Sequence, residues 1–290
     1  MRTGIRASTA ACLVAVASAL SAAAVDPESN KPVPPLKIAE RIYYVGTNEI
    51  AIFLIDSGDG LILLDGGFEP TPVQVLANIR TLGFDPRQVR YLLNSQAHFD
   101  HAGGLAELKR ATGAKMLASV ADAEILERGG RWDYYWGNDV EYPAVRVDEA
   151  VADGRKLKLG KVVMTAHFTP GHTPGCTTWT MPVVEKGRSY IAQFNCSTSV
   201  PGYRLLAMPR YRGVVDDYRS TFRKLKTLPC DIFLGAHASF FRMEEKRKAL
   251  AANPTRNPFI DPEGCRQHLA NSERAFEEQL AREERERGGS

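Results

Sequence analysis

The sequence predicts an α/β fold, and three observations support this class. The chain has 290 residues, 44% of them hydrophobic, which is enough to bury a substantial core. Short apolar runs alternate with stretches that have the apolar spacing of amphipathic helices. A cluster of metal-binding side chains directly follows one of the short runs. The length fits one large domain or two small ones, and we expect a single domain over residues 25–290.

Residues 1–24 have the features of a secretory signal peptide. Arg2 and Arg6 form a basic start. An apolar stretch over residues 10–24 follows and ends in three alanines that suit cleavage. This stretch is shorter than the roughly 20 residues that a membrane span needs, and no later stretch comes closer. We therefore expect an exported protein that is soluble after removal of the signal and resides in the periplasm.

The net charge and the cysteine content indicate which partners and which disulfides to expect. Without the two arginines of the signal, the 37 basic side chains fall to 35 against 34 acidic ones, a net charge of +1. This balance argues against a nucleic-acid partner. We expect a monomer that acts on a small molecule. In an oxidising compartment the four remaining cysteines allow three disulfide pairings, or else four free thiols. They are Cys176, Cys196, Cys230 and Cys265.

Extended segments come first along the mature chain. Apolar runs predict three strands, at residues 41–46, 50–56 and 61–65. Ser57-Gly-Asp-Gly60, between the second and third runs, predicts a hairpin turn. A helix over residues 71–82 follows, because a threonine can cap it, a proline suits its first turn and apolar residues recur on one face.

The middle of the chain continues the alternation and then breaks it. Strands are expected at residues 89–95 and 114–119, and helices at 105–111 and 121–128. The next stretch, residues 129–145, holds five aromatic residues and predicts a long loop. These rings form either a satellite cluster beneath the loop or the wall of an apolar cleft, with Trp136 as the expected substrate contact.

Strands and two helices complete the chain. The expected elements are strands at 157–159, 161–168, 177–184 and 189–194, a helix at 214–228, a strand at 230–234 and a charged helix at 266–287. The charge runs at residues 244–247 and 283–287 are interpreted as solvated helix faces.

The segment Gln96-Ala-His98-Phe-Asp100-His101 carries two imidazoles, a carboxylate and an amide at the end of a predicted strand. His172, in Thr-Pro-Gly-His-Thr-Pro-Gly, and His237, in Leu-Gly-Ala-His-Ala-Ser, lie in contexts that suit ligands. A strand end can aim alternate side chains at one ion, and the following turn redirects the next two at a second. We expect one metal to be held by Gln96, His98 and His172, and a second by Asp100, His101 and His237.

This donor set suits catalysis by zinc. Imidazole and carboxylate are zinc ligands, and three protein ligands per ion leave a position open for water, as in catalytic rather than structural sites. Zinc-bound water has a pKa of about 7 and can attack as hydroxide near neutral pH. Two neighbouring ions can divide the activation of the nucleophile and the stabilisation of the leaving group. Asp100 is the candidate catalytic residue, as a ligand that also orients the hydroxide.

These residues resemble the metallo-β-lactamase superfamily, whose first motif is His-x-His-x-Asp-His, over nearly all of the mature chain. The third subclass of class B metallo-β-lactamases is the nearer match. The likeness rests on residues 96–101, 171–175 and 197–203, and on Cys230 followed by His237. It implies a four-layer αβ/βα sandwich with the metals at one edge between the sheets. It also implies zinc-dependent hydrolysis of penicillins, cephalosporins and carbapenems.

The resemblance implies roles beyond the metal ligands. Ser197 and Ser199 stand where the subclass contacts the carboxylate of the antibiotic, and Tyr203 is expected to line the same pocket. Placement and resemblance together favour a disulfide between Cys230 and Cys265, which would pin the last helix to the core. Cys176 and Cys196 are then expected to be small, buried packing residues.

Two features separate the chain from relatives in that superfamily. Many thioesterases, lactonases and nucleases of the superfamily have a metal-bridging aspartate on the strand that corresponds to residues 191–197. Residues 191–197 of this chain contain no carboxylate, which favours the lactamase branch. Gln96 replaces the usual first histidine, as in the GOB-type minority of the subclass. An amide is a weaker zinc donor, so partial occupancy of the first site is expected, unless Gln96 is a structural amide that points away. The alternatives are a lactonase or thioesterase, and a non-catalytic zinc-binding protein.

Overall fold

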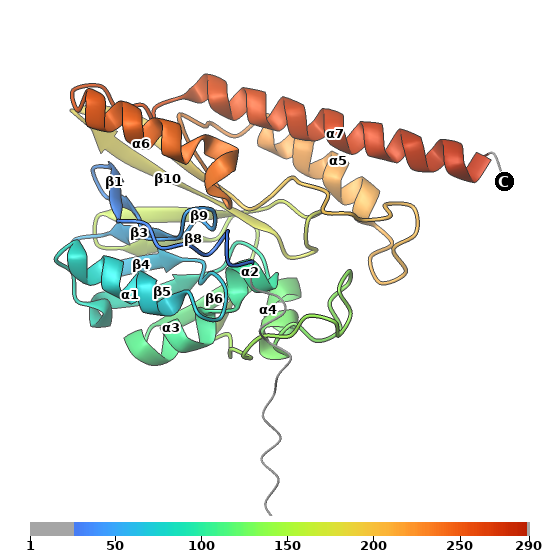
Figure 1. Ribbon diagram of the computed structural model, residues 1–290, viewed down its shortest axis with the longest axis horizontal. Helices are drawn as coiled ribbons and strands as arrows, with labels where there is room; N and C mark the ends of the chain where they lie inside the picture. Colours follow the sequence, from blue (N-terminus) through green and yellow to red (C-terminus); the bar gives the residue numbers. More distant parts are fainter. Residues whose placement is uncertain (1–25, 289–290) are drawn as a thin grey trace, which may run out of the picture.

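Two β-sheets lie face to face with helices on both outer sides (Figure 1). The computed structural model describes residues 26–288, so the expected signal peptide, residues 1–24, lies outside the described residues. Within that described part, no helix combines the length and the apolar character of a membrane span.

The first sheet has seven strands that follow one another in chain order. β1 to β4 form an antiparallel meander, and β4 to β7 run parallel because helices cross between them. Ser57 N donates to Gly60 O over 3.0 Å between β3 and β4, which confirms the predicted hairpin. The strands are β1 Leu36–Ala39, β2 Ile42–Tyr44, β3 Phe53–Asp56, β4 Leu61–Leu64, β5 Val89–Leu93, β6 Lys115–Ser119 and β7 Glu149–Val151.

The second sheet has five strands in the order β12-β11-β10-β9-β8. β8 to β11 are antiparallel neighbours, and β12 joins the edge parallel to β11. β12 therefore ends at the same edge as β11, and both strands are followed by segments with expected site residues. The strands are β8 Lys156–Leu159, β9 Val162–Phe168, β10 Thr177–Glu185, β11 Arg188–Asn195 and β12 Ile232–Gly235.

Helices complete a four-layer sandwich, which confirms the expected fold. α1 (Pro72–Thr81), α3 (Leu105–Thr112) and α4 (Val120–Glu127) pack on the outer face of the first sheet. α5 (Val214–Leu225), α6 (Met243–Ala252) and α7 (Pro262–Gly288) lie on the opposite side. The core between the sheets is fully apolar in its centre, where Phe53, Trp179 and Phe194 are each at most 2% exposed. This rigid core fixes the strand ends that carry the site.

The structure contains elements that the periodicity did not indicate. β1 and β7 are strands of four and three residues, too short for a reliable alternating pattern. α6 contains the charge run at 244–247. Thr71 does not cap α1 as expected, because its hydroxyl donates to Asn30 Oδ1 over 2.7 Å.

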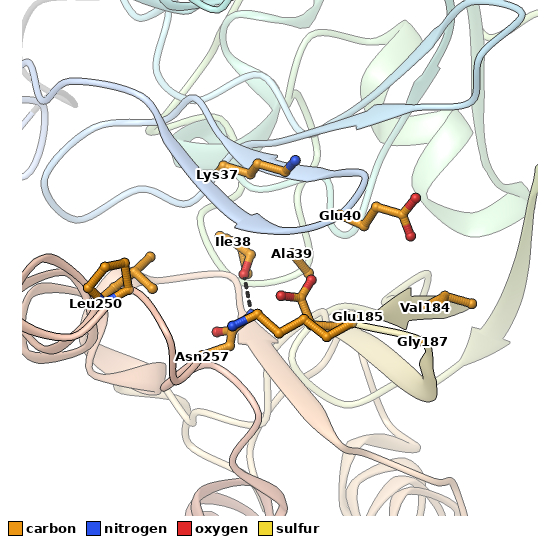
Figure 2. A pocket seen from close by; sticks show the side chains of 11 residues that line it. Lys37, Ile38, Ala39, Glu40, Val184, Glu185, Gly187, Leu250 and Asn257 are labelled. Carbon is orange, nitrogen blue, oxygen red and sulfur yellow. Dashed lines mark hydrogen bonds between the residues drawn. The ribbon is translucent and has the colours of Figure 1, made fainter.

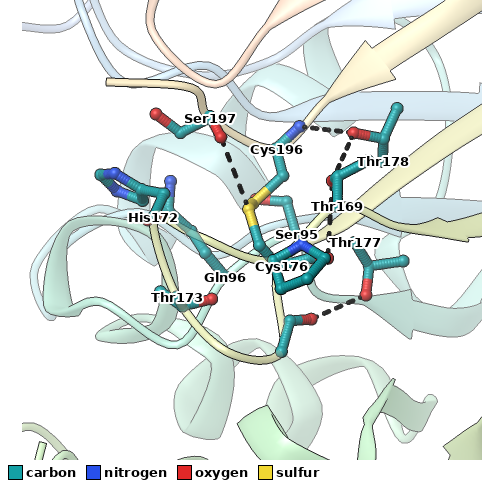
Figure 3. Close-up of a disulfide and its surroundings, with 12 residues drawn as sticks. Ser95, Gln96, Thr169, His172, Thr173, Cys176, Thr177, Thr178, Cys196 and Ser197 are labelled. Carbon is teal, nitrogen blue, oxygen red and sulfur yellow. Dashed lines mark hydrogen bonds between the residues drawn. A yellow bond between two sulfur atoms is a disulfide. The ribbon is translucent and has the colours of Figure 1, made fainter. Parts of the chain in front are cut away.

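Two disulfides link segments that are distant in the chain. One joins Cys230 to Cys265, the pair favoured by the sequence, and ties the start of α7 to the segment before β12. The other joins Cys176 to Cys196, so the expectation that these are separate packing residues was wrong (Figure 3). Their Cα atoms lie 5.8 Å apart because Cys176 precedes β10 and Cys196 follows β11, and the two strands form one antiparallel hairpin.

We expect the double substitution Cys230→Ser with Cys265→Ser to lower the free energy of unfolding by about 3 to 4 kcal/mol, because a loop of 35 residues is no longer closed in the unfolded chain. Guanidinium denaturation under non-reducing conditions measures this. An unchanged denaturation midpoint would contradict it.

Candidate metal centre

Four segments bring the expected donors to one edge of the sandwich. The loop after β5 carries Gln96 and His98, and a short helix α2 (Phe99–Ala102) carries Asp100 and His101. His172 lies in the loop between β9 and β10, and His237 follows β12. β5 of the first sheet and β12 of the second sheet both end at this edge, which is why residues from both sheets meet there.

The second predicted site, Asp100, His101 and His237, forms a compact cluster. One donor atom from each residue lies within 4.8 Å of the other two. The Nε2 atoms of His101 and His237 are 3.4 Å apart, and Asp100 Oδ2 lies 3.3 and 3.5 Å from them. On the far side of each ring, Nδ1 faces a carboxylate, Asp65 for His101 at 3.6 Å and Glu49 for His237 at 3.4 Å. These carboxylates favour N–H at Nδ1, so two Nε2 lone pairs converge on an anionic oxygen.

Such a convergence of acceptors is stable only with protons or a metal ion between them, and the pKa shifts of the three residues agree. Burial lowers the pKa of His101, but Asp100 and Asp65 raise it to about 10 overall. Burial likewise lowers the pKa of His237, yet Asp100 and Glu49 leave it raised. Burial raises the pKa of Asp100, but His101 and His237 hold it well below its usual value. The cluster thus binds protons strongly, and a divalent metal can replace them.

The first predicted site places two buried imidazoles edge to face. His98 Nδ1 lies 3.1 Å from His172 Nε2. His172 Nδ1 is 3.0 Å from the carbonyl oxygen of Ser199, which can only accept, so His172 carries its proton on Nδ1. Tyr203 donates its hydroxyl to the carbonyl oxygen of His172 and lies 3.3 Å from His98 Nε2, so it accepts from that nitrogen. Two lone pairs therefore face each other, and a metal ion resolves the repulsion.

Gln96 is the third predicted ligand of this first site. Its side chain is fully buried, and among the described residues neither amide atom has a hydrogen-bond partner. An unpartnered buried amide costs free energy that a bound ligand can offset. Burial lowers the pKa of His98, and burial with the neighbouring His98 lowers that of His172 still more, so both rings stay neutral ligands.

The expected substrate contacts lie next to the first site in different environments. Ser197 Oγ and Ser199 Oγ are 3.1 Å apart, and Ser199 Oγ is 3.3 Å from His172 Nδ1. Tyr203 is only 1% exposed and its hydroxyl is engaged by His98 and His172, so the structure makes it a support of the ligands and not a pocket wall as expected. Trp136 is half-buried, with its ring against Phe99 of the metal motif at 6.0 Å between centroids.

The carboxylates behind the metal ligands were not predicted from the sequence. Asp65 follows β4 in a left-handed conformation with φ of 68°, and it accepts hydrogen bonds from the amide and hydroxyl of Ser95. Asp133, in the aromatic loop, places Oδ2 4.0 Å from His98 Nε2. Asp65 precedes two glycines directly after a buried strand, which is a recognisable turn signal. No sequence pattern singled out Glu49 or Asp133.

A surface pocket of about 620 Å³ does not belong to this centre. β1, the turn after β10 and the segment after α6 line it, and Asn257 Nδ2 donates to Ile38 O there over 2.8 Å (Figure 2). None of its described lining residues is a predicted donor.

Comparison with known proteins points to one family. A family model described as the Metallo-beta-lactamase superfamily matches residues 45–184. The native FEZ-1 metallo-beta-lactamase from Legionella gormanii superposes with a TM-score of 0.86 at 38% identity, covering 88% of this chain and 98% of that one. BJP-1, a subclass B3 metallo-beta-lactamase of Bradyrhizobium japonicum, superposes with a TM-score of 0.84 at 39% identity, covering 89% and 97%.

Curated relatives match over a shorter part. A hydroxyacylglutathione hydrolase of Anaeromyxobacter dehalogenans is 30% identical over 42% of this chain and 38% of its own length. The chain spans no more than about half the length of this and two further curated relatives that it matches.

Zinc binding at the second site should release a proton, because His101 with a pKa of about 10 is protonated at pH 7. The affinity of that site should rise by about tenfold per pH unit between pH 6.5 and 8.5. The first site should vary little, because the pKa values of His98 and His172 are lowered. Calorimetric titration in two buffers of different ionisation enthalpy counts the protons. Zinc binding at the second site without proton release would contradict this assignment.

Proposed function

Because the chain belongs to the metallo-β-lactamase superfamily, we propose that it is a zinc hydrolase that opens the lactam amide of β-lactam antibiotics. The observation that carries this proposal is the compact cluster of Asp100, His101 and His237 beside the buried pair His98 and His172, with the amide of Gln96 buried and without a hydrogen-bond partner among the described residues. The likeness to two metallo-beta-lactamases over nearly their whole length supports the substrate class.

The donors fit two zinc ions, one held by Gln96, His98 and His172 and the other by Asp100, His101 and His237. Bound zinc supplies a Lewis acid that polarises the lactam carbonyl and lowers the pKa of water to about 7. The chain keeps that chemistry aligned, because Asp65 and Glu49 hold the Nδ1 sides of His101 and His237. Asp100 stays ionised, since the pKa of its carboxyl is held well below the usual value, and it can accept a hydrogen bond from the attacking water.

The substrate carboxylate is proposed to lie at Ser197 and Ser199. Their hydroxyls are 3.1 Å apart, and Ser199 Oγ lies 3.3 Å from a ligand of the first metal, so both can donate to one anion beside the reacting bond. Trp136 is proposed as a wall for apolar ring substituents, since its ring packs edge to face against Phe99 of the metal motif.

Two alternatives remain in different classes. A lactonase or thioesterase on the same scaffold is favoured by the hydroxyacylglutathione hydrolase relative, but residues 191–197 offer no bridging carboxylate. A non-catalytic zinc-binding protein is favoured by the weak amide donor Gln96.

We also propose where and in what form the protein works. Export through residues 1–24 to the periplasm is consistent with two disulfides, which form in oxidising compartments. Residues 25–290 are proposed to act as one domain and as a monomer on a small molecule.

Turnover by the purified protein separates these functions. We expect the protein to hydrolyse a carbapenem, which a fall in absorbance measures. Hydrolysis should stop when a chelator is added and resume when zinc is restored. A thioester substrate should remain intact in parallel reactions. Metal-dependent cleavage of the thioester alone would establish the alternative hydrolase, and zinc binding without turnover of either compound would establish the binding protein.

The substitution Gln96→His should raise zinc content under limiting metal, because imidazole is a stronger zinc donor than an amide. Elemental analysis after dialysis against substoichiometric zinc measures the difference. A matched change outside the site, Gln267→His on the exposed part of α7, is the control. Equal zinc content in the parent protein and Gln96→His would count against Gln96 as a ligand.

A further inference from the structure

We propose that Glu283, on the C-terminal helix α7, is a positioning residue for the first metal site. Its side chain is 7% exposed, whereas residues 284–287 of the same charge run are exposed. The expectation that the whole run is a solvated face was therefore wrong at Glu283. This proposal rests on the proposed binding of metal at the first site and names a residue, far from that site in the sequence, that maintains it.

Glu283 clamps the main chain of the segment after Tyr203. Its Oε1 accepts from the amide of Leu205 and its Oε2 from the amide of Leu206, each over 2.9 Å. Gln279, one turn earlier on α7, donates to Glu283 Oε1 and to the carbonyl oxygen of Tyr203. Burial raises the pKa of Glu283, but these hydrogen bonds lower it more, so the carboxylate is ionised at neutral pH. Hydrogen bonds to an ionised carboxylate are about twice as strong as neutral ones.

The clamped segment ends on the metal ligands. Tyr203, two residues before Leu205, has its hydroxyl between His98 Nε2 and the carbonyl oxygen of His172. His98 can offer Nδ1 to a metal only while its Nε2–H has an acceptor on the other side. The Oδ2 atom of Asp133 lies 4.0 Å from that nitrogen, so the Tyr203 oxygen at 3.3 Å is the nearer acceptor.

The arrangement is selective for one of the two sites. The ligands of the second site are held by carboxylates from segments next to strands of the first sheet. Asp65, after β4, lies beside His101, and Glu49, before β3, lies beside His237. Neither support contacts α7 or the segment 203–206 in the hydrogen bonds and ion pairs described for residues 26–288. Loss of the Glu283 clamp should therefore weaken the first site and spare the second.

The substitution Glu283→Gln tests this, because it replaces one of the two accepting oxygens with an NH2 group, which cannot accept a hydrogen bond from the main-chain N–H that it faces. Glu284→Gln, at the exposed neighbouring position, is the matched control. In the metal-free proteins, hydrogen exchange at Leu205 and Leu206 and the ¹⁵N shifts of the His98 ring report on the clamp. Stepwise zinc affinities, measured by competition with a chromophoric chelator, report on each site.

We expect Glu283→Gln to speed exchange at both amides, to shift the His98 ring signals and to weaken the first zinc site by about tenfold, at the low end for groups behind a ligand. The second site and the control should stay within about twofold of the parent.

Unchanged exchange at Leu205 and Leu206, or unchanged His98 signals, would overturn the proposal. Equal weakening of both sites would also overturn it, because that result describes a general structural role. If the parent binds no zinc at the first site, the proposed function fails in that respect, and the exchange and His98 shifts of the metal-free proteins still decide the role of Glu283.

Discussion

The structure depends on buried nitrogen and oxygen atoms that face one another and need a proton or a metal ion between them. His98 and His172 approach through ring nitrogens 3.1 Å apart, and His101 and His237 do so beside the carboxylate of Asp100. Each ring has its other nitrogen engaged on the outer side, which directs the lone pair inward. A cation between these atoms stabilises the arrangement, and the sandwich acts as the frame that holds the donors in place.

The four-layer architecture explains why the supporting groups come from so many places. Strand ends from both sheets meet at one edge, and each strand is fixed by a core in which the central aromatic side chains are buried. The groups behind the second site come from the first sheet, and those behind the first site come from the segment that α5 and α7 hold. Tyr218 of α5 donates to the carbonyl oxygen of Ser199, as Glu283 of α7 accepts from Leu205 and Leu206.

Much of this centre could be read from local patterns. Short segments of sequence were enough to predict most strands, the turn at residues 57–60 and the metal-binding motif at residues 96–101. Contacts between distant segments have no local sequence pattern from which they could be predicted. The disulfide between Cys176 and Cys196 depends on the pairing of β10 with β11, and Glu283 looks like any other acid in a charged run until the helix is docked. Glu49 was not predicted for the same reason, because it contacts His237 only in the assembled fold.

The disulfide between Cys176 and Cys196 lies four residues after the ligand His172 and one residue before Ser197, and its sulfur also approaches the Ser197 carbonyl. This disulfide covalently links the loop that carries His172 to the loop that carries Ser197 and Ser199, and so restricts their relative movement. New substrate shapes cannot be accommodated by sliding one loop past the other. A substrate of a different shape must therefore fit the spacing that this disulfide fixes between His172 and the hydroxyls of Ser197 and Ser199.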